Sequence, residues 1–119
     1  MKQKKQIKKE NYLERIPVRT DSILWKKDNK GQVTLDIENK GVFNWFAQTL
    51  LKRPKTSHIH LDSMGSFVWP LIDGEKDIYH ISELVKERFG EEANPLYERL
   101  IKFFEILLSY EFIYFKSNK

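Results

Sequence analysis

The chain has 119 residues, of which 40% are hydrophobic and 13% aromatic, which suits one packed domain and argues against a disordered chain. It contains no cysteine, so disulfides, thiolate metal sites and cysteine nucleophiles are excluded. The formal charge is +4, but five of the 21 basic residues lie within residues 1–9, and the rest of the chain carries 16 basic and 17 acidic side chains. The basic character therefore belongs to an N-terminal arm, predicted to be disordered over residues 1–12.

The start of the chain carries lysines and glutamines where a signal peptide needs an apolar stretch. No apolar run approaches the roughly 20 residues that span a bilayer, and the longest, over residues 103–115, is interrupted by Glu105 and Glu111. We therefore expect a cytoplasmic protein without a membrane partner.

The first part of the body has the pattern of a small antiparallel sheet. Residues 16–19 are predicted to be extended, because the residue before Pro17 is pushed out of the helical region. Residues 23–27 form a predicted strand that leads into a turn at 28–31. The next strand, over 33–37, alternates apolar and polar residues, which completes a hairpin. A third short strand is expected at 58–61.

Helical spacing of apolar residues appears first over 42–51, which predicts an amphipathic helix inserted at 42–53. A second helix is expected over 63–72, with Asp62 as its N-cap. Pro70 lies inside that helix and should kink or shorten its last turn, because proline removes one helical hydrogen bond.

Two longer helices complete the pattern. Asp77 is the expected N-cap of a helix over 78–89 that ends at Gly90. Pro95 is expected in the first position of the last helix, over 95–110, and an extended piece at 112–115 follows. The predicted fold is α+β: a small N-terminal antiparallel sheet followed by three α-helices, similar to a winged helix-turn-helix.

The last helix is too apolar for a single buried face. At 100° per residue its apolar positions cover an arc of roughly 220°, whereas a helix on a core needs a stripe a little over about 100° wide. The surplus is covered either by other parts of this chain, such as the segment at 42–51, or by a partner.

The stretch from His60 to Gly74, with the motif Trp69-x-x-x-Asp73-Gly74 at its end, resembles the PqqD family, named for the pyrroloquinoline quinone synthesis protein D. The resemblance spans residues 18–114 and implies a single domain over 13–116, followed by a short tail at 117–119. The chain departs from the family pattern at Pro70 and in its long connection over 39–57.

The resemblance implies a non-catalytic peptide binder that uses no cofactor. Members look like recognition elements that hold the leader of a ribosomally made precursor peptide and present it to a modifying enzyme, such as a radical S-adenosylmethionine enzyme. In that mode the leader adds as a strand beside the third strand and lies against the last helix. Carried over by position, the peptide-binding residues are Ser57, His58, Ile59, His60, Leu61, Tyr97, Ile101, Phe104 and Leu108. Leu100, Phe103 and Leu107 would then face the core.

Other functions remain open on the sequence. A winged helix could bind DNA, although Glu98 and Glu105 share the exposed side of the last helix with Arg99 and Lys102, which disfavours phosphate contacts. The apolar surplus could also hold a second copy in a homodimer, which sedimentation at several concentrations would reveal.

No arrangement of nucleophile, base and metal ligands typical of an enzyme is recognisable in the chain. His58 and His60 are two apart on a predicted strand and therefore share a face, where they could chelate a metal, with His80 as a third imidazole. Two half-exposed histidines beside a binding groove are the simpler interpretation.

Overall fold

The computed structural model describes residues 12–39 and 55–116 and has an α+β fold. Its contacts divide the chain into two compact units, with boundaries after residue 20 and after residue 66. We call the described residues 21–39 and 55–66 the strand unit, and residues 12–20 and 67–116 the helical unit. The expected helix at 42–53, nearly all of the expected arm at 1–12 and the tail at 117–119 lie outside the described residues. The winged-helix arrangement stays a prediction.

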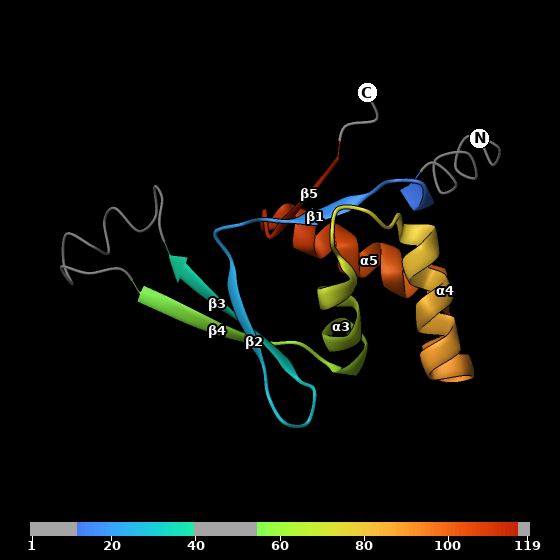
Figure 1. Ribbon diagram of the computed structural model, residues 1–119, viewed down its shortest axis with the longest axis horizontal. Helices are drawn as coiled ribbons and strands as arrows, with labels where there is room; N and C mark the ends of the chain where they lie inside the picture. Colours follow the sequence, from blue (N-terminus) through green and yellow to red (C-terminus); the bar gives the residue numbers. More distant parts are fainter. Residues whose placement is uncertain (1–11, 40–54, 117–119) are drawn as a thin grey trace. The chain divides into compact units, whose positions relative to one another are not determined.

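The strand unit contains a three-stranded antiparallel sheet in the order β2-β3-β4 (Figure 1). The strands are β2 (Leu24–Lys27), β3 (Val33–Asn39) and β4 (Lys55–His60). The expected hairpin is confirmed, and the third strand begins three residues earlier than predicted.

The turn of the β2–β3 hairpin is fixed by Asp28. Its carboxylate accepts hydrogen bonds from the main-chain N–H groups of Lys30 and Gln32, both at 2.9 Å, and Gly31 adopts a φ of 88°. This is the turn chemistry that the sequence predicted, because Asp bonds its own backbone and glycine adopts a positive φ without strain.

Helix α3 (Ser63–Val68) follows β4 and begins where predicted, since the Asp62 carboxylate accepts from the N–H of Gly65 at 2.8 Å. The expected helix over 63–72 ends early: residues 69–71 form the 3-10 helix η1 (Trp69–Leu71), with Pro70 in its first turn. The predicted shortening by Pro70 is therefore confirmed. Ser66 Oγ ties α3 to the sheet of the strand unit by accepting from Val33 N–H and donating to the Leu61 carbonyl.

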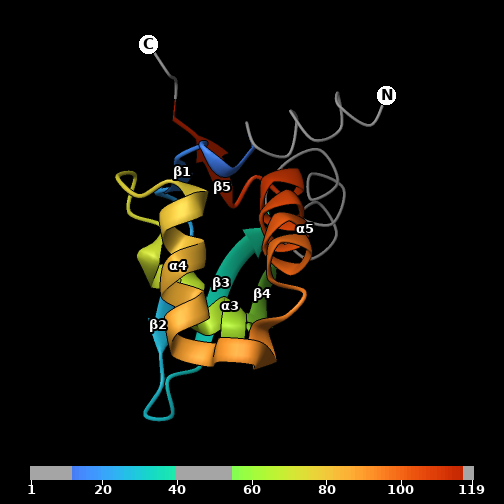
Figure 2. The same cartoon turned by 90° about the vertical axis from the view of Figure 1, so that its right-hand side faces the viewer.

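The helical unit contains α4 (Ile78–Phe89), the 3-10 helix η2 (Gly90–Ala93) and α5 (Leu96–Ser109), with α4 and α5 side by side (Figure 2). Asp77 caps α4 as predicted, accepting from His80 N–H at 2.8 Å, and Gly90 ends it. Pro95 precedes α5 as its N-cap rather than occupying the first helical position. Within the described part of the chain, no helix is both long and apolar enough to cross a membrane.

A two-stranded antiparallel sheet joins the ends of the helical unit. Strand β1 (Pro17–Arg19) pairs with β5 (Ile113–Phe115), which confirms that the end of the chain packs back onto the body. Most of the unit's buried apolar side chains come from η1, α4, α5 and β5. They include Trp69, Ile78, Ile81, Val85, Leu100, Phe104, Leu107 and Ile113.

Candidate functional site

Strand β4 lies at an edge of its sheet: among the described strands it pairs with β3 alone. Leu61 N–H donates to the Val33 carbonyl at 2.9 Å, next to the paired residues of β3 and β4. Because hydrogen-bonded pairs alternate along an antiparallel ladder, Ile59 bonds β3 through its main chain, whereas the main-chain groups of His58 and His60 point away from β3. The outer edge of β4 therefore presents main-chain donors and acceptors at these two histidines.

The two histidine side chains are held by the neighbouring strand. His58 lies opposite Asp36 and His60 lies opposite Thr34. His58 Nδ1 is 2.6 Å from Asp36 Oδ1, and His60 Nδ1 is 2.8 Å from Thr34 Oγ1. Both histidine rings are thereby fixed on one face of the sheet while the residues stay exposed.

The other three predicted peptide-binding residues of this region share the opposite face. Leu61 is buried, Ser57 is half-buried and Ile59 is 36% exposed. Their neighbours in β3 on this face include the fully buried Val33 and Leu35. Ile59 thus extends an apolar surface to the outer edge of β4.

The second edge of the sheet differs in charge. Strand β2 pairs only with β3 among the described strands and carries exposed Lys26 and Lys27. Lysines on an edge strand discourage the addition of another strand. Among the described side chains, those of residues 57–60 of β4 include no lysine, which makes β4 the better template.

Helix α5 has two apolar flanks beside a buried stripe formed by Leu96, Leu100, Phe104 and Leu107. The Tyr97 flank consists of half-buried Tyr97 and Ile101 with Leu108, which is 37% exposed. The Ile106 flank consists of half-buried Phe103 with Ile106 and Tyr110, which are 45% and 67% exposed.

Of the α5 residues predicted to bind peptide, the Tyr97 flank contains Tyr97, Ile101 and Leu108, whereas Phe104 is fully buried. Leu100 and Leu107 are buried as expected, and Phe103 is only half-buried. The surplus of apolar residues noticed in the sequence thus lies on both sides of the helix.

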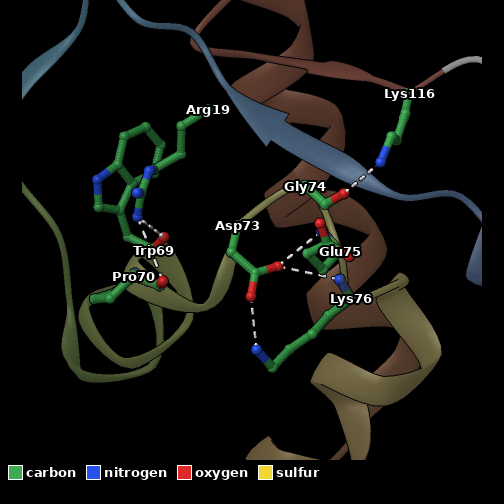
Figure 3. Close-up of polar contacts among 8 residues, drawn as sticks. All are labelled: Arg19, Trp69, Pro70, Asp73, Gly74, Glu75, Lys76 and Lys116. Carbon is green, nitrogen blue, oxygen red and sulfur yellow. Dashed lines mark hydrogen bonds and ion pairs between the residues drawn. The ribbon is translucent and has the colours of Figure 1, made fainter.

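The loop that carries the Trp-x-x-x-Asp-Gly motif is held by its acidic residue (Figure 3). Asp73 Oδ1 accepts from the main-chain N–H groups of Glu75 and Lys76, at 2.9 and 3.1 Å. Asp73 Oδ2 accepts from Lys76 Nζ at 2.7 Å. The Lys76 ammonium and these two N–H groups hold the pKa of the Asp73 carboxyl well below its usual range.

Two basic side chains fasten the same loop to the small β1–β5 sheet (Figure 3). Arg19 Nη1 donates to the carbonyls of Trp69 and Pro70, at 3.3 and 3.4 Å. Lys116 Nζ donates to the Gly74 carbonyl at 3.0 Å. The motif therefore builds a structural connection between η1 and α4, and its partners Arg19 and Lys116 are distant in the sequence.

Comparison with known families matches residues 32–113 to the family described as Coenzyme PQQ synthesis protein D (PqqD). The match covers more than half of the chain, including β3, β4, α3, α4 and α5. The chain belongs to the PqqD family. No curated protein and no solved structure matches it.

Gly74, the glycine of this PqqD motif, has a φ of 79°, which only glycine adopts without strain. A Cβ there would meet Val18 Cγ2 at 3.6 Å, an ordinary contact, so the conformation and not the space makes glycine necessary. We predict that Gly74→Ala lowers the free energy of unfolding by about 1–2 kcal/mol and Gly74→Asn by less, because asparagine tolerates positive φ better. Urea unfolding measures both; equal stability of Gly74→Ala and wild type would contradict this assignment.

Asp73 makes stability depend on pH in a defined direction. A carboxyl whose pKa is depressed on folding stabilises the folded state above its ordinary pKa of about 3.9, and this stabilisation disappears as the pH falls. The side chain is well exposed, so we expect less than about 1 kcal/mol. Asp73→Asn should therefore be less stable than wild type at neutral pH and should converge with it below about pH 4. A stability difference between wild type and Asp73→Asn that grows as the pH falls would contradict this prediction.

The histidines do not form a three-residue metal site in the described structure. His80 Nδ1 is 2.6 Å from Asp77 Oδ1 on its own helix cap. Within residues 12–39 and 55–116, no group of three or more histidine, aspartate or glutamate side chains could hold a metal ion.

Sequence reasoning missed Asp36 and Thr34, the partners of His58 and His60. Both belong to the polar positions of the alternating strand at 33–37, so the signal was present. Using it requires the register of β3 on β4, and the connection over 40–54 is too long for a turn type to fix that register.

Proposed function

We propose that this PqqD family member is a non-catalytic peptide-binding protein that recognises the leader of a ribosomally synthesised precursor peptide and presents it to a modifying enzyme. The family name places its members in coenzyme PQQ synthesis. The observation that carries the proposal is the edge position of β4, with the main-chain groups of His58 and His60 directed outward. A radical S-adenosylmethionine enzyme is the partner class that the family resemblance implies.

Strand addition explains how such a module gains affinity without a deep pocket. The incoming strand pairs its main chain with β4, and its side chains alternate between the two faces of the sheet. On one face they would meet His58 and His60, and on the other they would meet Ser57, Ile59 and Leu61. The lysine-bearing β2 edge is disfavoured for the same role.

The proposal also assigns the Tyr97 flank of α5 to the leader. Tyr97, Ile101 and Leu108 offer apolar surface for side-chain contacts, which give specificity where main-chain bonds cannot. Phe104 lies beneath this flank in the buried stripe and would support it rather than touch the peptide.

A titration followed by amide NMR shifts tests the proposal. The labelled protein is mixed with synthetic leader segments of short peptides encoded beside its gene and, separately, with duplex DNA. We expect one of these segments to shift residues of β4 and of the Tyr97 flank, and DNA to shift neither. Shifts with DNA that persist after removal of residues 1–9 would instead support the winged-helix regulator, because the lysine arm could no longer cause them.

A further inference from the structure

Strand β5 forms the outer edge of the small β1–β5 sheet in the helical unit (Figure 2). On its other side, β1 meets the loop of the Trp-x-x-x-Asp-Gly motif through an antiparallel bridge between Val18 and Asp73. Strand β1 therefore has a neighbour on each side, whereas β5 pairs with β1 alone among the described strands. A strand at the edge of a sheet is a template for the addition of another strand.

Two hydrogen bonds beside β5 fix the phase of its ladder with β1. Thr20 N–H donates to the Phe112 carbonyl at 2.9 Å, and Lys116 N–H donates to the Ile16 carbonyl at 2.8 Å. Hydrogen-bonded and non-hydrogen-bonded pairs alternate along an antiparallel ladder. The pair halfway between these two bonds, which contains Tyr114, is therefore also hydrogen-bonded to β1.

The residues on either side of Tyr114 belong to non-hydrogen-bonded pairs. The main-chain N–H and C=O groups of Ile113 and Phe115 therefore point away from β1. No hydrogen bond joins these groups to another residue in the described part of the chain. The outer edge of β5 thus presents main-chain donors and acceptors placed symmetrically about Tyr114.

The sequence of β5 carries none of the features that protect an edge strand. Lysines and prolines commonly discourage strand addition, and β2 has two lysines, whereas β5 has the sequence Ile-Tyr-Phe. The lysine that follows β5, Lys116, donates its ammonium to the Gly74 carbonyl at 3.0 Å, in the motif loop beyond β1. No charged side chain of β5 therefore opposes a strand that pairs with it.

Exposed tyrosines accompany this edge. Tyr114 is 53% exposed, and Tyr110, at the end of α5, is 67% exposed. The Tyr110 ring stacks on Phe112, with ring centroids 5.5 Å apart. Phe112 lies two residues before Tyr114 and shares its side of the extended chain. An aromatic surface thus runs from the end of α5 to the edge, and aromatic side chains are enriched in interfaces between proteins.

We propose that a second copy of this chain occupies the edge, with the two β5 strands paired antiparallel across a two-fold axis at Tyr114. In this register Ile113 of each copy pairs with Phe115 of the other, and the outward main-chain groups of both residues are satisfied. The two Tyr114 side chains lie directly opposite each other, with Cα atoms about 4.5 Å apart. An identical strand fits because the donors and acceptors are symmetric about an uncharged aromatic side chain, which meets itself.

The dimer is expected to be weak. It joins two three-residue strands and their tyrosines, and it buries less than the roughly 1,200 Å² at which specific stable complexes begin. We therefore expect a dissociation constant of about 0.1–1 mM. This inference does not rest on the proposed function, because no residue of β4 or of the Tyr97 flank takes part in it.

Opposite charges at residue 114 test the inference. Sedimentation velocity of the full-length wild type from about 20 µM to about 1 mM should show a mass that rises toward that of a dimer. Tyr114→Glu and Tyr114→Lys should each associate at least about tenfold more weakly, because like charges then lie directly opposite each other. An equimolar mixture of the two variants should recover association, since glutamate then faces lysine across the two-fold axis.

Tyr79→Glu is the matched control variant. Tyr79 is 46% exposed, similar to Tyr114, but it lies on α4 and not on a strand edge. It should leave the dissociation constant of the dimer unchanged. Amide NMR spectra of the wild type provide a measurement without any substitution: dilution should shift the amides of Ile113 and Phe115, which lose their partners as the dimer dissociates.

Three results would each overturn the inference. They are a wild type that stays monomeric up to about 1 mM, a dimer that Tyr114→Glu weakens no more than Tyr79→Glu does, and a mixture that associates no better than its components. Peptide binding at β4 should be the same in Tyr114→Glu as in wild type. Failure of the dimer therefore leaves the peptide-binding function standing, and failure of peptide binding leaves the dimer standing.

Discussion

Replacing His58 by proline abolishes strand addition and leaves the fold intact. The His58 N–H points away from β3, so proline removes a donor that the sheet itself does not use. The incoming strand loses that hydrogen bond and meets the proline ring, and we expect peptide affinity to fall by more than about tenfold. Fluorescence anisotropy with a labelled peptide measures the loss, and thermal unfolding measures the stability.

Two control variants isolate the main-chain effect. His58→Ala removes the same side chain but keeps the N–H, so its affinity should fall no more than about fivefold. Ile59→Pro removes a donor that bonds to Leu35 in β3, and it should therefore destabilise the sheet by about 1–3 kcal/mol. Equal affinities of His58→Pro and His58→Ala would mean that the peptide does not pair with β4.

Phe104→Ala lowers the free energy of unfolding by about 3–5 kcal/mol, the usual cost of truncating a buried phenylalanine. Leu108→Ala on the same helix should cost about 1 kcal/mol or less, because Leu108 is 37% exposed and leaves no cavity in the core. Urea unfolding measures the free energy of unfolding of both variants, and we expect Phe104→Ala to be clearly the less stable.

Peptide binding by these two variants distinguishes a residue that supports the Tyr97 flank from a residue that contacts the peptide. Leu108→Ala should weaken binding of a leader without unfolding the protein, since it truncates an exposed part of the Tyr97 flank. Phe104→Ala should affect binding only through its loss of stability. A well-folded Phe104→Ala variant with lost affinity would contradict the expectation that Phe104 acts on binding only through stability.

The local structure of this chain was largely predictable from its sequence. Asp28, Asp62 and Asp77 each signalled a turn or helix start that the structure confirms, because a short carboxylate side chain satisfies nearby main-chain N–H groups. Pro70 likewise explains why α3 ends at Val68, because proline lacks the main-chain N–H that a continuing helix would use.

Features that depend on contacts between distant residues were not predictable. The sequence shows Asp73-Gly74 as part of a family motif. It does not show that Arg19 and Lys116 anchor this motif, because their positions depend on the pairing of β1 with β5. The burial of Phe104 could not be told from its spacing, because the apolar arc of the last helix was wide enough to allow several buried stripes. For such a helix, tertiary packing determines which of its sides is buried.

The most direct test of strand addition at β4 is amide hydrogen exchange by NMR, with and without a peptide selected by binding. We predict that the amides of His58 and His60, which point away from β3, exchange at least about tenfold more slowly when peptide is bound, because they then donate to its main chain. The amide of Ile59, already bonded to β3, should change less. Binding that leaves His58 and His60 unprotected, or that protects only residues outside β4, would contradict the proposed mode of recognition.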